Sequence, residues 1–240
     1  MTKDPIIILV KPQLAENVGM AARAMMNCGL SQMRLVNPRE DHLCLKGRRA
    51  SSGAEEILER ARVYLSLREA IADLQQVYAT TARHRDQVKE VYTADHAAVL
   101  LSRMADENMA CGIMFGPERT GLTNEDVSLA DAIINIPLNP RHCSLNLSQA
   151  VLLAGYEYYK THTTAPAAQL VTNGGDIADK EKMCRFFDFL EEKMQGCGNF
   201  KNEERHNKLV INLRNAFLRS KMTEQELNSI YGIINYLSNH

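Results

Sequence analysis

The sequence predicts an α/β protein built on an open, mainly parallel sheet. The run Ile6–Val10 is apolar and rich in β-branched residues, which is typical of a strand buried on both faces of a parallel sheet. A helical segment and a second short apolar run, Met33–Val36, follow it. The same alternation recurs up to about residue 160, which favours a sheet covered by helices.

The remaining elements of this part are placed by apolar runs and by residues that begin or end helices. The first helix is expected over Asn17–Cys28, with Gly29 ending it. Further strands are expected at Val77–Ala82, Ala110–Phe115 and Ile133–Ile136. Helix starts are expected at Ser52 and Ser66, each with a glutamate three residues later, at Thr123, and near Ser144, whose helix runs to about Lys160.

A change of composition predicts a second part. Residues 161–179 are rich in Thr, Ala, Pro and Gly and lack an amphipathic period, which indicates a linker. Three helices are then expected, at Lys180–Met194, Lys201–Arg219 and Thr223–Leu237. The expected organisation is an α/β domain at 1–160, the linker at 161–179 and a small α-helical extension at 180–240.

Composition narrows the class of protein. With 240 residues, 45% of them hydrophobic, 24% charged and a net charge of −1, the chain is expected to be a soluble globular protein. The six cysteines form no CxxC pair, so neither a metal site nor a disulfide framework is expected. The first apolar run has five residues, too short for a signal peptide, and a cytoplasmic location is expected.

Two basic clusters could contact a polyanion. One holds Lys46, Arg48 and Arg49, and the other, Arg83-His84-Arg85, follows the third strand. Because the chain has no overall cationic excess, a nucleic acid would have to be bound by local patches of this kind. Either cluster is otherwise a solvated surface.

Two turns after strands are candidate ligand sites. The first, KPQLAENVGMAAR, has a single glycine, which disfavours a dinucleotide or P-loop site, but Asn17 and Arg23 could face an anionic ligand. The second, FGPERTGLTNED, leaves a strand through Gly116-Pro117 and presents Glu118 and Arg119. The alternative for the second turn is a purely structural loop with an internal Glu118-Arg119 pair.

The stretch IPLNPRHCSLNLSQAV places His142 beside Cys143 at an expected helix start. A reactive thiolate is one interpretation, but adjacent residues of an extended chain point to opposite faces and no third residue is evident to orient the histidine. A structural cysteine is the favoured interpretation. Backbone N–H groups at Ser144-Leu145-Asn146 are instead available to a ligand.

Three segments in this order, ENVGMAARAM, FGPERTGL and IPLNPRHCSLNLSQAV, together resemble the motifs of the SPOUT class of RNA methyltransferases, in the TrmH-like branch that modifies a ribose 2′-hydroxyl. The resemblance implies a C-terminal trefoil knot in the sheet domain, S-adenosyl-L-methionine as cofactor, a homodimer and a tRNA substrate. Extended through VYATTAR and the C-terminal helices, it implies methylation at nucleotide 32 of the anticodon loop.

The resemblance also assigns residues. Arg23 is implied at the reacting oxygen, supported by Asn17, Glu118, Ser144 and Asn146. The implied cofactor contacts are Thr80, Thr81, Ala82, Gly116, Ile136, Ser144, Leu145 and Asn146. Ala79 and Thr81 differ from the family pattern at this strand end. The difference changes side chains only, so backbone contacts from this loop to the cofactor are still expected. Three alternatives stay open: the same reaction on another tRNA position or on rRNA, a non-catalytic RNA-binding protein, and a Cys/His hydrolase.

Overall fold

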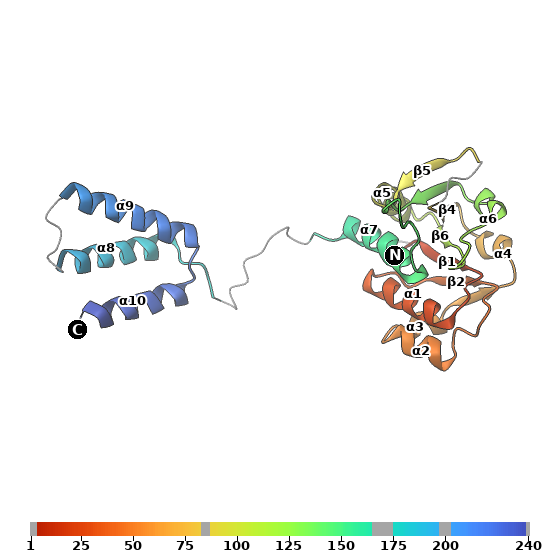
Figure 1. The fold of residues 1–240 in the computed structure, drawn as a ribbon, viewed down its shortest axis with the longest axis horizontal. Helices are drawn as coiled ribbons and strands as arrows, with labels where there is room; N and C mark the ends of the chain where they lie inside the picture. The colour runs from red at the N-terminus through yellow and green to blue at the C-terminus, as the bar shows by residue number, and fades with distance from the viewer. Residues whose placement is uncertain (1–3, 83–86, 165–174, 197–202, 239–240) are drawn as a thin grey trace. The chain divides into compact units, whose positions relative to one another are not determined.

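The computed structural model describes residues 4–82, 87–164, 175–196 and 203–238 (Figure 1). The chain divides into two compact units, Met1–Ala165 and Pro166–His240. This division falls within the predicted linker. The Arg83-His84-Arg85 cluster lies outside the described residues.

The described part of the first unit contains a seven-stranded sheet of order β3-β2-β1-β6-β4-β7-β5, in which all neighbouring strands are parallel. The predicted α/β class with a mainly parallel sheet is confirmed. Strand order does not define how the connections are threaded, so the trefoil knot stays a prediction. The strands are β1 (Ile6–Val10), β2 (Met33–Val36), β3 (Arg62–Tyr64), β4 (Gln76–Thr80), β5 (Glu90–Thr93), β6 (Cys111–Phe115) and β7 (Ala132–Asn135).

Helices cover both faces of this sheet (Figure 1). Alternate side chains of β1 point to opposite faces: Ile7 and Leu9 pack in one buried cluster with α1, α3, α5 and α7, while Ile6, Ile8 and Val10 pack in another with α4 and α6. The sheet therefore lies in the middle of three layers. The helices are α1 (Ala15–Asn27), α2 (Leu45–Ser51), α3 (Glu55–Glu59), α4 (Leu67–Ile71), α5 (Ala94–Asp106), α6 (Asn124–Ser128) and α7 (Leu147–His162).

Several helix ends agree with the sequence predictions. Gly29 follows α1 with a φ of 71°, a conformation that glycine adopts without strain. The Ser66 side chain accepts a hydrogen bond from the Glu69 backbone and begins α4. Thr123 and Asp126 form a capping box at α6.

Two predicted helix starts are wrong. Ser52 does not begin a helix but ends α2 in the left-handed conformation, and Glu55 reaches back to the Gly53 backbone. The last helix of the unit starts at Leu147 and not near Ser144, because Asn146 and Gln149 form its capping box. Three short elements, α2, β3 and β5, were not predicted from the sequence, because their short runs carry weak periodicity.

The second unit contains three described helices, α8 (Lys180–Gly196), α9 (Glu203–Ser220) and α10 (Glu224–Ser238), which confirms the helical prediction. Within it, α8 lies between α9 and α10 (Figure 1). The unit has its own core around Phe186, which is buried among Met183, Phe187 and Leu227. No helix of the described residues in either unit is long and apolar enough to cross a membrane.

Candidate functional site

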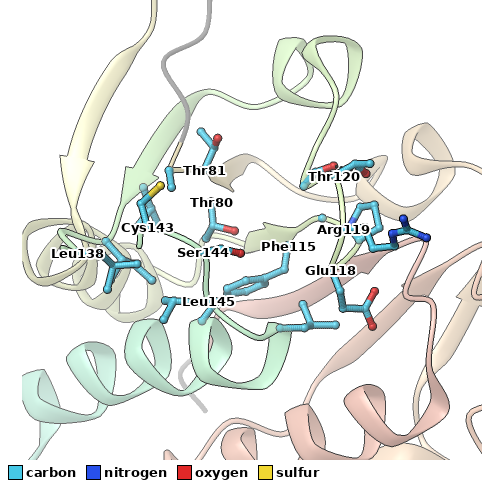
Figure 2. A pocket seen from close by; sticks show the side chains of 18 residues that line it. Thr80, Thr81, Phe115, Glu118, Arg119, Thr120, Leu138, Cys143, Ser144 and Leu145 are labelled. Atoms are coloured by element: carbon cyan, nitrogen blue, oxygen red, sulfur yellow. Dashed lines mark hydrogen bonds between the residues drawn. The ribbon is translucent and has the colours of Figure 1, made fainter. Parts of the chain in front are cut away.

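The loops that follow β4, β6 and β7 meet at one edge of the sheet. Because β4 lies between β6 and β7 and all three strands are parallel, their carboxyl ends point the same way. The loops enclose a cavity of about 240 Å³ (Figure 2). Its lining residues are Thr80, Thr81, Ala82, Phe115, Gly116, Pro117, Glu118, Arg119, Thr120, Gly121, Ile134, Ile136, Leu138, Cys143, Ser144, Leu145, Leu147 and Ala150.

Gly116 allows the β6 loop to fold back closely on itself. A Cβ atom at this position would lie 2.1 Å from the Leu122 nitrogen and 2.3 Å from the Gly121 carbonyl carbon. Gly121 itself has a φ of +66°. These two glycines therefore build a wall of the cavity from backbone, which a ligand can approach without meeting a side chain.

The β4 loop is fixed by hydrogen bonds to its neighbours. The Thr80 hydroxyl donates to the Met114 carbonyl at 2.8 Å, and the Thr81 backbone N–H donates to the Ile134 carbonyl at 3.2 Å. Thr80 thus uses its hydroxyl to attach β4 to β6. In Figure 2, Cys143 and Leu138 lie on one side of the cavity, and Thr120, Arg119 and Glu118 lie on the other.

A hydrogen-bond network joins the three segments that carry the resemblance. The buried Asn17 amide nitrogen donates to Glu118 Oε1 at 2.7 Å, and the Asn146 amide nitrogen donates to Asn17 Oδ1 at 3.1 Å. Glu118 Oε2 also accepts the Gln13 backbone N–H at 3.0 Å. Since Asn17 is both acceptor and donor, it connects the wall of the cavity with the start of α7.

The start of α1 is held by carboxylates from outside the helix. Leu14 precedes it and offers no capping side chain. Glu118 accepts the Gln13 N–H, and Glu40 Oε2 accepts the Ala15 N–H at 2.9 Å. Negative charge is favourable at this end of a helix, because the first N–H groups have no partner within the helix.

Most of the predicted cofactor contacts lie together. Thr80, Thr81, Ala82, Gly116, Ile136, Ser144 and Leu145 all line the cavity, whereas Asn146 belongs to the network beside it. Among the residues predicted for catalysis, Glu118 and Ser144 also line the cavity, and Asn17 is bonded to Glu118. Their roles remain predictions.

Arg23 lies apart from this group. It is exposed on α1 and does not line the cavity, and no hydrogen bond or ion pair joins its side chain to another residue in the described ranges. The alternative interpretation of the Glu118 loop, an internal pair with Arg119, is not seen, because Glu118 faces Gln13 and Asn17. Arg119 instead lines the cavity.

Several cavity residues were not predicted from the sequence. Phe115, Leu138, Leu147 and Ala150 supply apolar side chains to it. They come from a strand, a loop and a helix, and look like core residues in the sequence. The Gln13 contribution is a backbone N–H, which carries no signal in the residue type.

The adjacent pair His142 and Cys143 does not form a catalytic arrangement in the structure. Both residues are exposed, and Cys143 lines the cavity whereas His142 does not. The His142 backbone N–H donates to the Asn139 carbonyl at 2.8 Å as part of a turn. Across the described ranges, no group of three or more His, Cys, Asp or Glu side chains could hold a metal ion.

Comparison with known proteins identifies the family. A profile of the SpoU rRNA methylase family matches residues 4–156. A Haemophilus influenzae protein named as an uncharacterized tRNA/rRNA methyltransferase is 32% identical, over 98% of this chain and 94% of its own. A tRNA (cytidine/uridine-2′-O-)-methyltransferase TrmJ from Photorhabdus laumondii is 32% identical, over 98% of this chain and 96% of its own.

The fold agrees with the sequence comparison. The crystal structure of TrmJ from Z. mobilis ZM4 superposes with a TM-score of 0.82 at 39% identity, over 98% of this chain and 99% of that one. The resemblance drawn from the three segments is confirmed, and so is the enzyme class that it implies. The chain is a methyltransferase and belongs to the SpoU rRNA methylase family.

Proposed function

We propose that this chain is an S-adenosyl-L-methionine-dependent tRNA methyltransferase that modifies the ribose 2′-hydroxyl at nucleotide 32 of the anticodon loop. The observation that carries the proposal is the network joining Asn17, Glu118 and Asn146 beside the cavity. It unites all three segments on which the resemblance depends. The relatives named TrmJ support tRNA and the 2′-hydroxyl as the substrate.

The cavity suits a nucleoside cofactor. Phe115, Leu138 and Leu147 offer apolar contacts of the kind that a base requires, and the backbone around Gly116 permits a close approach by polar groups. Thr81, Ala82, Ile136 and Leu145 complete the lining with small or apolar side chains. We expect these residues to hold S-adenosyl-L-methionine, whose sulfonium group supplies an activated methyl.

The chain's own part in the reaction is mainly positioning. Methyl transfer requires the ribose oxygen to lie in line with the bond that breaks, and such alignment lowers a barrier by several kcal/mol. Glu118 and Asn17 fix the cavity wall relative to α1, and Asn146 fixes it relative to α7. The network therefore fixes the cavity wall relative to α1 and α7 of the same chain.

Arg23 is proposed to act on the RNA at the reacting ribose. An arginine side chain stays charged at neutral pH, so it is a poor acceptor for the hydroxyl proton. It is well suited to orient a phosphate and to stabilise negative charge developing on the ribose oxygen. We propose that the proton leaves to a phosphate oxygen or to water.

We propose that a second copy of the chain supplies the Arg23 that acts at the cavity. Arg23 is exposed on α1 outside the cavity of its own chain, and α1 packs beside α7. Both helices expose large apolar side chains, which are often buried in subunit interfaces. They are Met20 and Met26 of α1 and Leu152, Leu153, Tyr156 and Tyr159 of α7. We propose that this surface forms a homodimer.

The proposed function is tested by mapping methylated ribose in RNA. Total tRNA and ribosomal RNA lacking the modification are incubated separately with the protein and a cofactor labelled on its methyl group, then digested and analysed by mass spectrometry. We expect label on a ribose 2′-oxygen at nucleotide 32 of a subset of tRNAs. Alkali cleaves a phosphodiester bond only where the adjacent 2′-hydroxyl is free. Resistance of the bond on the 3′ side of the labelled nucleotide therefore distinguishes ribose methylation from base methylation.

The outcomes separate the parts of the proposal. Label at another tRNA nucleotide would overturn the position but not the substrate class. Label in ribosomal RNA alone would overturn tRNA as the substrate. If neither RNA received label from protein that binds the cofactor, a non-catalytic RNA-binding role would replace the enzymatic one.

A further inference from the structure

The cations of the Lys46-Gly47-Arg48-Arg49 run have different surroundings in the structure. Arg48 is half-buried: its Nε donates to the Leu43 carbonyl at 3.0 Å, and its Nη1 lies 2.6 Å from Glu59 Oε1. Arg48 therefore has a structural role. Lys46 and Arg49 lie three residues apart on α2, which places them on the same side of the helix, and both are exposed.

A close contact between two glycines holds α2 against α1. A Cβ on Gly19 would lie 2.2 Å from the Gly47 carbonyl oxygen, so only glycine permits this approach. The contact brings Lys46 Nζ to 3.5 Å from Glu16 Oε1 on α1. Arg49 has no ion pair or side-chain hydrogen bond with any residue in the described part of the chain.

The same surface continues to Arg23. Glu16 and Arg23 are seven residues apart on α1, so they share a face of the helix and lie about 10 Å apart along its axis. Asn17, next to Glu16, is bonded to Glu118 in the wall of the cavity. The exposed cations Arg23, Lys46 and Arg49 thus lie on one α1–α2 surface, and its Glu16 end is next to Asn17 in the sequence.

We propose that Lys46 and Arg49 bind the phosphate backbone of the tRNA and extend the RNA contact made by Arg23. This inference rests on the proposed tRNA function. Three cations about one or two helical turns apart fit the regularly spaced phosphates of an RNA strand. Each arginine can bind a phosphate through two N–H groups. Glu16 is an acidic residue on this surface, and Lys46 pairs with it.

The test compares tRNA binding by the full-length wild type and the double variant K46A/R49A at several salt concentrations. We expect affinity to fall at least about ten-fold at low salt, and the slope of log affinity against log salt to become shallower by about 1.4 to 1.8, because two phosphate contacts are lost. Cofactor affinity, measured by calorimetry, should stay at the wild-type value and show that the variant is folded.

A matched control removes two exposed cations elsewhere. Arg68 of α4 and Arg103 of α5 are exposed and do not line the cavity, so R68A/R103A makes the same change of net charge. It should keep most of the tRNA affinity and the wild-type salt slope. The single variant R49Q keeps a polar side chain but removes one charge. Its salt slope should differ from the wild-type slope by about half as much as that of K46A/R49A.

Failure of this inference can be told from failure of the proposed function. If the wild type methylates tRNA but K46A/R49A binds it with unchanged affinity and slope, the phosphate-binding surface is wrong. An equal loss in R68A/R103A would show a general effect of charge and would also overturn it. If the wild type neither binds nor methylates tRNA, the proposed function itself fails.

Discussion

Single residues at this site act mostly through what they hold in place. Asn17 is the clearest case, because its one amide group joins Glu118 on the cavity wall and Asn146 at the start of α7. The type of residue matters here: an asparagine side chain both donates and accepts, whereas an aspartate in its ionised form can only accept. An aspartate would therefore repel Glu118 instead of binding it.

Arg23→Ala tests the proposed catalytic role. Since Arg23 is exposed and lies outside the cavity, its removal should leave folding and cofactor affinity near wild type. Methyl transfer to tRNA should fall at least about 100-fold, because charge stabilisation at the reacting oxygen is lost. Calorimetry and single-turnover transfer assays measure the two effects separately. Loss of cofactor affinity in step with activity would show that Arg23 binds the cofactor instead.

Cys143→Ala tests the hydrolase alternative. Cys143 lines the cavity, but no hydrogen bond between it and His142 is present in the structure. The variant should retain methyl transfer to within about two-fold, since a lone exposed thiol contributes little beyond packing. If activity disappeared while cofactor affinity stayed normal, the thiol would have a chemical role.

At the scale of elements, an ion pair between a buried arginine and an exposed carboxylate connects the sheet to the turn after α4. Arg34 of β2 has a side chain that is only 6% exposed, and its two terminal nitrogens donate to Asp73 at 2.5 and 2.8 Å. A further bond from Arg34 goes to the Ala70 carbonyl at 2.6 Å. The hydrogen bonds and charge of Arg34 hold the pKa of Asp73 below its ordinary value of 3.8.

Asp73→Asn should therefore destabilise the protein and change its response to acid. Because the folded pKa of Asp73 is lowered, its contribution is present above about pH 3.8 and is lost as the pH falls through the folded pKa. At pH 7 we expect a loss of about 1.5 kcal/mol in the free energy of unfolding, since Arg34 is buried and loses its charged partner, while the exposure of Asp73 lets solvent screen part of the attraction.

Urea denaturation at pH 7 and at successively lower pH measures this effect. The difference between wild type and D73N should shrink below pH 3.8. Glu59→Gln is the matched control: it removes a carboxylate paired with Arg48, whose side chain is 42% exposed against 6% for Arg34, so the loss should stay below about 1 kcal/mol. Equal losses in the two variants would contradict the prediction.

At the scale of the whole molecule, the proposed dimer predicts that two defective subunits can restore one site. Arg23→Ala leaves the cavity intact. Gly116→Val prevents the loop after β6 from folding back to form the cavity wall, because even a Cβ would lie 2.1 Å from the Leu122 nitrogen. Each variant alone should be inactive. Because a dimer that pairs them has one complete site, co-expression should restore about a quarter of wild-type activity by random pairing.

This complementation distinguishes shared sites from self-contained ones. Analytical ultracentrifugation of the wild type should show a dimer, and a charged residue at Tyr156, which is exposed on α7, should produce monomers. Absence of any restored activity in dimers proven to contain both variants would mean that each site uses the Arg23 of its own chain.

The second unit leads to a further prediction for the whole molecule. It has its own core around Phe186, so deletion of Pro166–His240 should leave the first unit folded and able to bind the cofactor. We expect the helices of the second unit to make a second, tethered contact with tRNA. The deletion removes this contact, so tRNA affinity should fall at least about ten-fold. Fluorescence anisotropy with labelled tRNA measures this, and unchanged affinity would contradict the prediction.

Prediction from the sequence succeeded where the signal was local. The apolar runs at Ile6–Val10 and Met33–Val36 are fully buried strands with the predicted bounds, and Gly29 ends α1 as expected. The start of α7 was placed about three residues early, because Ser144 and Asn146 are both plausible caps in the sequence. Two hydrogen bonds identify Asn146 as the true one: its backbone N–H donates to Gln149 Oε1, and its side chain accepts from the Ser148 N–H.

The sequence by itself determined the α/β class, because the hydrophobic period is written along the chain. Through the family resemblance it also indicated the three segments that belong together and eight expected cofactor contacts, seven of which line the cavity. The tertiary structure decided that Asn17 bridges residues more than 100 positions away, that Arg48 is structural while Arg49 is exposed, and that Arg23 lies outside its own cavity. Contacts of this kind depend on how parallel strands and packed helices bring distant residues together, and no local pattern encodes them.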